Sequence, residues 1–256
     1  MRKRLVFGLF FALAMQASAQ WIGRKTPGLP RLDNGAPNLN APAPRRDGRP
    51  ELSGVWQVDN LTWLQDINQH VPGGIPMTAE TQALVRQRAD GAHGLDEPDA
   101  HCLPQGVPKI NSTPVPFEFI ESPGKVVVLY EAFGQYRQIH TDGRPAIASK
   151  EAPAPAWLGY SVGRWQGDVF VVDTTGFNGR TWIDSAGHPT SEATRVTERI
   201  TRKDWGHMEM EITIDDPTLY TKAFAYKQLF HLVPDTDVLE FVCLENERDL
   251  IHMRNR

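Results

Sequence analysis

One stretch of the sequence concentrates side chains that can transfer protons. It contains Asp173, Asp184, His188, Glu192 and Glu198. An imidazole titrates near neutral pH, and carboxyl groups that are buried or placed side by side acquire pKa values suited to acid–base chemistry. We therefore predict these five residues as catalytic groups. The sequence shows neither a G-x-G-x-x-G fingerprint nor a P-loop, so no cofactor is expected and the predicted reaction is that of a lyase, an isomerase or a hydrolase.

The dipeptide Asn178-Gly179 predicts how two of these carboxylates are placed. It stands between two extended runs, where Asn-Gly favours a two-residue type I′ hairpin turn. Such a turn puts Asp173 opposite Asp184, with Cβ atoms about 4.5 to 5.5 Å apart. Two like charges at that distance need a proton, an arginine or a metal between them. The alternative is that one of the two carboxylates lies at the strand end and points to solvent.

The loop after Asp184 supplies the candidate proton carrier. Extended runs flank this loop on both sides, and loops held in this way often carry catalytic groups. We predict that His188 is the proton shuttle; the alternative is a solvated loop histidine. His140 and Asp142 could join His188 in a metal triad. However, Asp142-Gly143 is typical of a hairpin turn, so no metal site is predicted.

Alternation at period two places charged side chains among apolar ones. The pattern puts Glu131, Arg137, Asp173 and Glu198 on the same faces as valine, leucine and isoleucine side chains. Charged groups are not buried without partners. Either arginines such as Arg164 pair with these carboxylates as interior salt bridges, or the charges line a pocket in which burial raises a carboxyl pKa. The pattern leaves both interpretations open.

Aromatic and basic residues near these carboxylates indicate what such a pocket would bind. We expect a small, aromatic or otherwise apolar molecule to pack against the rings, and arginines to hold an anionic oxygen. The predicted substrate-binding residues are Arg137, His140, Tyr160, Arg164, Trp165 and Trp182. Two other classes stay open: a non-catalytic, lipocalin-like binding protein with the same pocket, and a structural envelope protein in which the charges are salt bridges alone.

Most of the chain after Pro116 is predicted to form strands. Runs of alternating polarity lie at 126–133, 135–141, 159–165, 168–177, 193–201, 207–214, 223–233 and 237–245. Short turn sequences separate them, as in an antiparallel meander. We predict a mainly β fold in which this meander closes into a lipocalin-like barrel, with a two-sheet sandwich as the alternative. One short helix is expected near 78–89, where Thr78 caps the start.

The N-terminal residues predict export. Residues 1–19 combine a basic start, an apolar run and the small-residue site Ala17-Ser18-Ala19, as in a secretory signal peptide. Residues 20–50 are rich in proline and glycine and are interpreted as a tether. Residues 51–256 are then a single β-rich domain. The expected location is the periplasm or the extracellular medium.

The two cysteines fit this location. Cys102 and Cys243 are the only cysteines, and export allows them to form a disulfide. The alternative is a pair of buried free thiols.

The charge balance argues against polyanionic partners. Removal of the signal peptide changes the formal charge from −4 (27 basic against 31 acidic side chains) to −7 (24 against 31). No basic face stands out, so nucleic acid and anionic membrane surfaces are not expected as partners. No later run is long and apolar enough for membrane insertion after signal cleavage. A small molecule is the expected partner.

Several motifs in the chain resemble those of a known family. They are ELSGVW (51–56), CLPQGVP (102–108), YRQIHTDGR (136–144), WLGYSVGRWQGDVFVVDTTGFNGRTWID (157–184), GHPTSEATRVTER (187–199), TIDDPTLYTKAF (213–224) and CLENERD (243–249). In this order they resemble a family of exported bacterial proteins of unassigned function. The resemblance covers the whole domain and implies a shared fold and a shared polar centre. This chain departs from the pattern at Thr190, where the family usually has a second histidine, and at Gly179, where it usually has aspartate.

Overall fold

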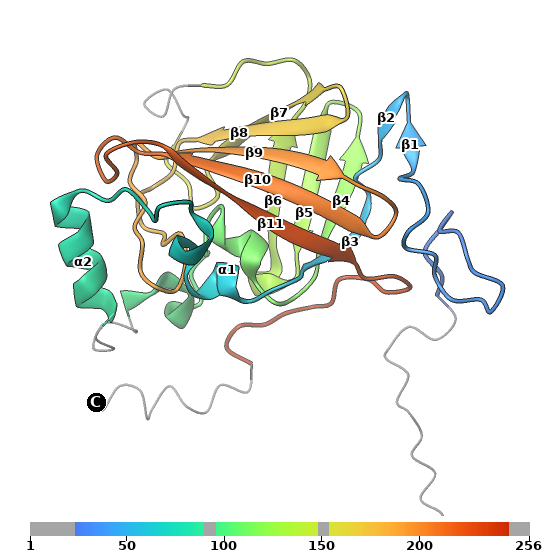
Figure 1. The fold of residues 1–256 in the computed structure, drawn as a ribbon, viewed down its shortest axis with the longest axis horizontal. Helices are drawn as coiled ribbons and strands as arrows, with labels where there is room; N and C mark the ends of the chain where they lie inside the picture. Colours follow the sequence, from blue (N-terminus) through green and yellow to red (C-terminus); the bar gives the residue numbers. More distant parts are fainter. Residues whose placement is uncertain (1–23, 90–95, 148–153, 246–256) are drawn as a thin grey trace, which may run out of the picture.

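The chain forms a closed β-barrel (Figure 1). The computed structural model describes residues 24–89, 96–147 and 154–245. The barrel strands are β3 (Gly54–Val58), β4 (Phe117–Ser122), β5 (Lys125–Tyr130), β6 (Gln135–His140), β7 (Tyr160–Gln166), β8 (Val169–Thr175), β9 (Arg195–Arg202), β10 (His207–Asp215) and β11 (Phe224–Leu232). They pair in chain order, and β11 pairs with β3 to close the ring. The predicted barrel is confirmed, and the alternative sandwich is not formed.

One pair of neighbouring strands departs from the predicted antiparallel meander. β6 and β7 run parallel, with Ile139 opposite Ser161 and His140 opposite Val162. Strand direction can alternate around a closed ring only if the number of strands is even. A ring of nine strands must therefore contain a parallel pair. Parallel neighbours need a crossover connection, and residues 141–159 supply it.

Alternation along the strands builds the core, although it does not always show which face is inside. In β9, Val196, Glu198 and Ile200 are buried as predicted. In β5 the inner face carries Val126, Val128 and Tyr130, so the prediction that Glu131 shares the inner face is wrong. An error of one residue moves every side chain to the other face. The run 126–129 in β5 is apolar at every position, so no polar side chain shows which face is exposed.

β8 shows the same ambiguity. Thr174 is buried and contacts interior side chains, so Phe170 and Val172, which share its face, also point inward. Asp173 therefore lies on the outer face, contrary to the prediction. Because the run from 169 to 172 is apolar at every position, the sequence does not show which of its two faces is inside.

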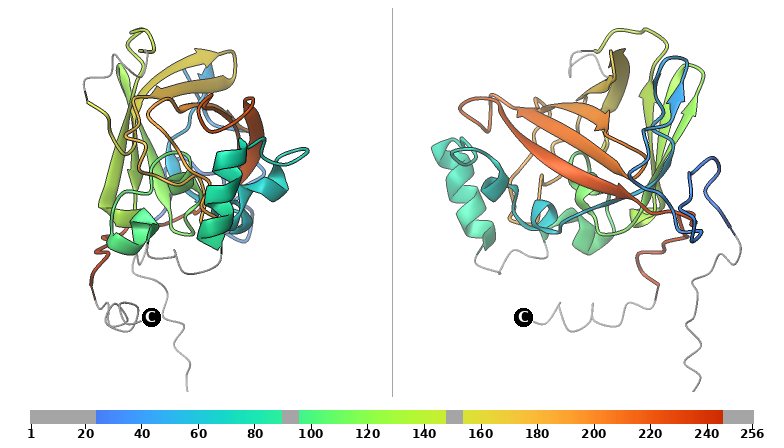
Figure 2. Two further views of the ribbon diagram at one scale, coloured as in Figure 1. Left: turned by 90° about the vertical axis from the view of Figure 1, so that its left-hand side faces the viewer. Right: turned by 45° about the vertical axis from the view of Figure 1, so that its right-hand side comes forward.

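The helical elements confirm one prediction and add others. α2 (Ala79–Ala89) occupies the predicted range, and the Thr78 hydroxyl accepts a hydrogen bond from the Thr81 N–H at 3.2 Å. α1 (Thr62–Gln65) and the 3₁₀ turns η1 (Ile67–His70) and η4 (Lys109–Ser112) were not predicted. They lie at one end of the barrel, whereas the hairpin of β1 (Arg45–Arg46) and β2 (Arg49–Pro50) lies at the other (Figure 2). All four residues of η4 are buried, so this turn plugs its end of the barrel.

Residues 237–245 do not form the predicted last strand. β3 already occupies the free edge of β11, so no edge remains for them. β3 and β4, neither of which was predicted as a strand, complete the ring instead.

The described part of the predicted tether, residues 24–50, packs on the barrel. Both nitrogens of the Arg31 fork bind the Asp235 carboxylate, at 2.8 and 2.5 Å. Backbone hydrogen bonds join Trp205 to Ala41 and Gly206 to Leu39. Although this segment is rich in proline and glycine, its described part is bound to the barrel and is not a free tether. The predicted signal peptide, residues 1–19, lies outside the described residues.

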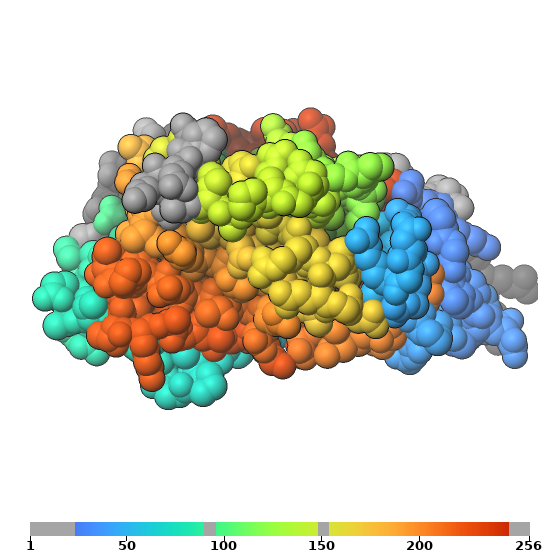
Figure 3. All heavy atoms as spheres, turned by 90° about the horizontal axis from the view of Figure 1, so that it is seen from above, coloured from blue at the N-terminus to red at the C-terminus, as the bar shows by residue number. Residues whose placement is uncertain are grey.

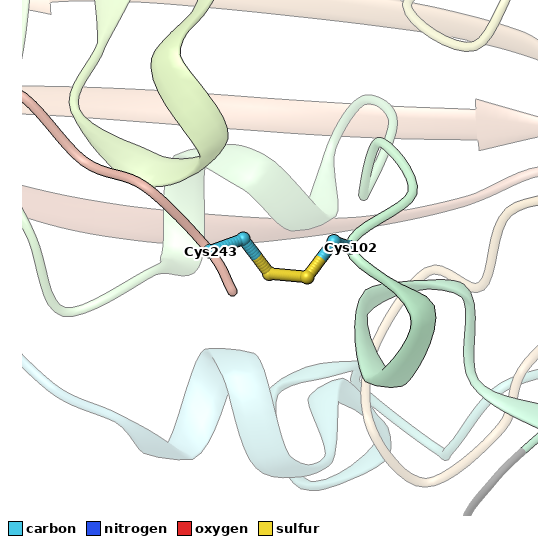
Figure 4. Close-up of a disulfide and its surroundings, with 2 residues drawn as sticks. All are labelled: Cys102 and Cys243. Carbon is cyan, nitrogen blue, oxygen red and sulfur yellow. A yellow bond between two sulfur atoms is a disulfide. The ribbon is translucent and has the colours of Figure 1, made fainter. Parts of the chain in front are cut away.

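The predicted disulfide is present (Figure 4). It joins Cys102 to Cys243 with a Cα–Cα distance of 5.8 Å and fixes the segment after β11 to the plugged end. A disulfide fits an oxidising, non-cytoplasmic compartment. Among the described residues, no helix combines the length and the hydropathy that crossing a bilayer requires.

Removing the disulfide is expected to lower the free energy of unfolding by about 4 to 5 kcal/mol, because the bridge restricts a long loop of the unfolded chain. The two cysteines are 141 positions apart. Urea denaturation of a Cys102→Ala/Cys243→Ala variant measures the loss. Reducing agent should destabilise the natural protein and leave this variant unchanged; equal unfolding free energies for the two proteins would contradict the prediction.

Acid is expected to release the N-terminal segment. The hydrogen bond from Arg31, opposed by partial burial and helped by the Thr26 N–H, holds the pKa of Asp235 at about 2. The unfolded value is about 3.9. Because the folded pKa is depressed, this contact stabilises the segment above pH about 4 and is lost as the pH falls toward 2.

Hydrogen exchange of the Thr26 amide, which donates to Asp235 at 2.8 Å, reports this release. Asp235→Asn should show faster exchange already at neutral pH. Asp168→Asn, which removes an exposed pair with Arg45, is the control. Protection of the Thr26 amide, relative to an unprotected amide at the same pH, that stays constant between pH 5 and 2 would argue against the contact.

Candidate active site

The two carboxylates that the sequence places opposite each other are far apart in the fold. Asp173 lies opposite Val162 on β7 and Thr197 on β9. On the outer surface it pairs with Arg164 and accepts a hydrogen bond from the Thr197 hydroxyl at 2.8 Å. Asp184, in contrast, is buried at the plugged end. The predicted Asp173-Asp184 pair is wrong, because both edges of β8 are already occupied by β7 and β9.

The chain reverses later than predicted. Asn178-Gly179 makes a local turn in which the Asn178 side chain accepts from the Arg180 N–H. The hairpin-like reversal falls at 184–187, where Trp182 bridges to Pro189 and the Ile183 N–H donates to the His188 carbonyl at 2.7 Å. This reversal brings the side chains at its two ends together.

Asp184 and His188 form a buried dyad across this reversal. Asp184 is fully buried and His188 is 3% exposed. The imidazole Nδ1 lies 2.8 Å from both carboxylate oxygens, and the Ile67 N–H donates to the carboxylate at 2.8 Å. With Nδ1 bound to the carboxylate, Nε2 is the ring nitrogen left for another partner. The described residues form no hydrogen bond with Nε2. The ring therefore has the orientation of a general base.

Neighbouring elements hold the reversal in place. The Arg88 guanidinium from α2 lies 4.4 Å from the centre of the Trp182 ring and donates to the Gly187 carbonyl at 2.6 Å. Burial lowers the pKa of Arg88. Gly187 has φ +93°, and a Cβ there would lie 2.8 Å from the Arg88 side chain, so the position requires glycine. The Tyr220 hydroxyl donates to the Pro189 carbonyl at 2.6 Å.

Asp66, between α1 and η1, extends the dyad. One ligand atom from each of Asp66, Asp184 and His188 lies within 4.8 Å of the other two. Carboxylate and imidazole are ligands that divalent cations accept. The triad considered from the sequence does not form, because His140 ends β6 and Asp142 follows it, at the opposite end of the barrel. Asp66 also caps η1 by accepting from the Asn68 N–H at 2.8 Å.

A second buried centre, the interior pair, joins Arg137 and Glu198. Glu198 is fully buried and accepts from Arg137 at 2.5 and 3.1 Å and from the Asn111 amide at 2.9 Å. Arg137 also donates to Ser161 and Thr174. Both charged groups are thus fully partnered, which favours the salt-bridge interpretation for Glu198.

The charges of the interior pair act on their surroundings. Burial alone would lower the pKa of Arg137, but the charge of Glu198, together with smaller contributions from Tyr130 and from the hydrogen bond to Glu198, outweighs burial, so the net pKa is raised. Burial raises the pKa of Tyr130 to about 12. The Tyr130 hydroxyl therefore stays protonated and donates to Asn111 at 2.9 Å. Asn111 belongs to η4, so the plug and the interior pair stabilise each other.

Of the predicted substrate-binding residues, Trp182 lies beside the dyad and Arg137 lies in the interior pair. Tyr160 and His140 stack with ring centres 5.1 Å apart, next to the β6 end. Burial, and then the charges of Arg144 and Lys125, lowers the pKa of His140. Glu192, predicted as catalytic, is exposed on the turn before β9. These residues therefore do not converge on one site.

Trp165 and Arg164 line a pocket of about 530 Å³ at the barrel end that carries the β1–β2 hairpin. The Arg49 guanidinium lies 5.2 Å from the centre of the Trp165 ring. Arg46 also lines this pocket. Figure 3 shows the hairpin (light blue) lying against β7 and β8 (yellow).

Comparisons with protein-family models, with curated proteins and with solved structures find no match to this chain. The family resemblance suggested by the motifs stays a prediction. Asp66, Arg88 and Asn111 were not predicted as site residues. Asp66 lies between α1 and η1, Arg88 on α2 and Asn111 on η4. Tertiary packing brings these residues to the two centres, and no local pattern marks them.

Glu198→Gln is expected to lower the free energy of unfolding by about 3 to 5 kcal/mol, because it leaves the buried Arg137 guanidinium without its counter-charge. Urea denaturation measures the loss. Asp173→Asn, which removes the exposed partner of Arg164, should cost about 0 to 1 kcal/mol. An Arg137→Met/Glu198→Met variant should recover most of the stability. Equal costs for the interior and the surface substitution would show that burial adds nothing to the interior pair.

Proposed function

We propose that this protein is an exported enzyme that acts on a small molecule by acid–base chemistry. In this proposal His188 transfers the proton and Asp184 orients and stabilises the imidazole. One observation carries the proposal: Nδ1 is bound to a buried carboxylate while Nε2 has no hydrogen-bond partner among the described residues. Hydrogen bonding of one ring nitrogen to a carboxylate is how general-base histidines are positioned.

The burial of the dyad supports this role. Asp184 accepts hydrogen bonds from the Ile67 N–H and from the imidazole, and more weakly from the His188 N–H at 3.4 Å. No basic side chain other than His188 pairs with it among the described residues. The carboxylate therefore directs its charge at the ring and stabilises the imidazolium that forms when Nε2 takes a proton.

The surroundings favour an apolar or aromatic substrate. Trp182 is buried beside the dyad, and Trp63 of α1 is buried near Asp66 in the chain. Acid–base chemistry without a cofactor is compatible with a lyase, an isomerase or a hydrolase. The disulfide supports the periplasm or the extracellular medium as the site of action.

A non-catalytic binding protein is the second candidate. The pocket of about 530 Å³ at the opposite barrel end favours it. Its size is within the usual range for small-molecule sites. Trp165 supplies an apolar face, and Arg46 and Arg49 supply positive charge. In this alternative the dyad is a structural contact that supports the reversal at 184–187.

Replacing His188 separates the two candidates. Two general reactions serve as assays: exchange of α-protons of small ketones in D₂O, followed by ¹H NMR, and hydrolysis of p-nitrophenyl esters, followed by absorbance. The turnover found with the natural protein should fall by about 10²- to 10⁴-fold in His188→Gln, because the proton-transfer group is lost. Asp184→Asn should also lower turnover, because the ring loses its orienting charge.

His207→Gln is the matched control. His207 also pairs through Nδ1 with an aspartate, Asp204, at 2.8 Å, but on the exposed surface. This variant should retain full turnover. Absence of any His188-dependent turnover would favour the binding protein. Loss of turnover in EDTA that a divalent cation restores would instead assign the chemistry to a metal at Asp66, Asp184 and His188.

A further inference from the structure

Two buried polar atoms on β11 have no hydrogen-bond partner among the described residues. They are the Tyr226 hydroxyl and the Gln228 side-chain oxygen. Tyr226 is 3% exposed and Gln228 is fully buried. Buried polar groups are nearly always paired in native proteins, so each exception needs an explanation. Because two exceptions lie two residues apart, a shared cause is the simplest one.

Both side chains point into the barrel. Burial alternates along β11, with Tyr226, Gln228 and Phe230 inside and Lys227 and Leu229 exposed. Residues two apart on a strand are about 7 Å apart along one face. The Gln228 amide nitrogen donates to the Ser112 hydroxyl of the plug at 2.5 Å, which leaves the amide oxygen as the free acceptor. The two groups therefore present a hydroxyl and an acceptor on the same inner face of β11.

The charges around Tyr226 connect it to both buried centres. Burial, and then the negative charges of Asp184 and Glu198, raises the pKa of Tyr226 well above its usual value. The phenol thus stays neutral and can donate a hydrogen bond. Arg137 compensates the charge of Glu198, but no basic side chain other than His188 pairs with Asp184 among the described residues, so the charge of Asp184 disfavours an anion beside the phenol. The chemistry at this point of the interior consequently favours a neutral guest.

We propose that Tyr226 and Gln228 bind a neutral small molecule that carries a carbonyl oxygen next to an N–H or O–H group, as in a carboxamide, a lactam or a hydroxycarbonyl compound. The Tyr226 hydroxyl donates to the carbonyl oxygen, and the Gln228 oxygen accepts from the N–H or O–H. This inference rests on the proposed function, because it names the substrate class on which His188 acts. A carbonyl polarised by the phenol becomes more susceptible to proton transfer at its neighbouring atoms.

Binding of neutral amides tests the proposal directly. The probes are acetamide, 2-piperidone and benzamide, with acetate and benzoate as anions of matching shape. Isothermal titration calorimetry on the natural protein at pH 7.5 should show at least one amide binding about tenfold or more tightly than its anion. Tyr226→Phe should weaken that amide about tenfold, the ratio expected for one lost hydrogen bond. Gln228→Met should weaken it as well.

Two controls keep the readout specific. Tyr136→Phe changes an exposed tyrosine on β6 and should leave amide binding unchanged. Tyr226→Phe should keep the melting temperature of the natural protein, because the Tyr226 hydroxyl has no partner to lose in the described part of the chain. With [ζ-¹³C]tyrosine, the resonance that disappears in Tyr226→Phe identifies this residue among five tyrosines. That resonance should shift when the bound amide is added.

Each outcome decides for or against the proposal. Failure of all three amides to bind, equal binding of amides and anions, or amide binding that Tyr226→Phe leaves intact would overturn it and assign the two groups to internal water. His188→Gln separates this proposal from the proposed function, because it should abolish turnover and preserve amide binding. Tyr226-dependent binding together with turnover that ignores His188 would sustain this inference and refute the catalytic role.

Discussion

Closure of the ring by pairing of β11 with β3 is the constraint on which the rest of the structure depends. A closed ring leaves no strand edge free. For this reason residues 237–245 stay outside the sheet. For the same reason the chain after Asn178-Gly179 cannot pair with β8. An odd number of strands also requires a parallel pair, and β6 and β7 form it. The crossover, the displaced reversal and the segment held by the disulfide all follow from that closure.

Closure also creates an interior in which charge needs compensation. The interior pair meets this requirement within the protein, since Arg137 and Glu198 bind each other and hydroxyl or amide groups from β7, β8 and η4. The dyad meets it differently, because backbone N–H groups and one imidazole surround Asp184. A saturated charge pair stabilises the structure, whereas an imidazole with one free nitrogen can exchange a proton. This difference is why we interpret Glu198 as structural and propose a chemical role for His188.

Tyr226 lies under the influence of both centres. The negative charges of Asp184 and Glu198 each contribute to its raised pKa. The plug reaches the same region, since Ser112 of η4 holds Gln228 and Asn111 holds Glu198. The barrel strands therefore supply hydroxyl and amide groups, while the reversal at 184–187 supplies the dyad. The proposed site therefore depends on how this reversal packs against the barrel.

The sequence by itself determined the barrel, the helix at 79–89, the disulfide and the burial of Arg137 and Glu198, because each follows from local alternation, capping or a limited choice of cysteine partners. Local pattern also identified Asp184 and His188 as chemically notable. Only the tertiary structure decided which carboxylates meet. Asp173 turned outward because the apolar run of β8 has no sequence mark for its inner face, and Asp66 joined the dyad through packing of α1 against the loop. Contacts between distant segments depend on which strand edges are free and on how the helices and 3₁₀ turns pack at the barrel end, and no local pattern encodes either.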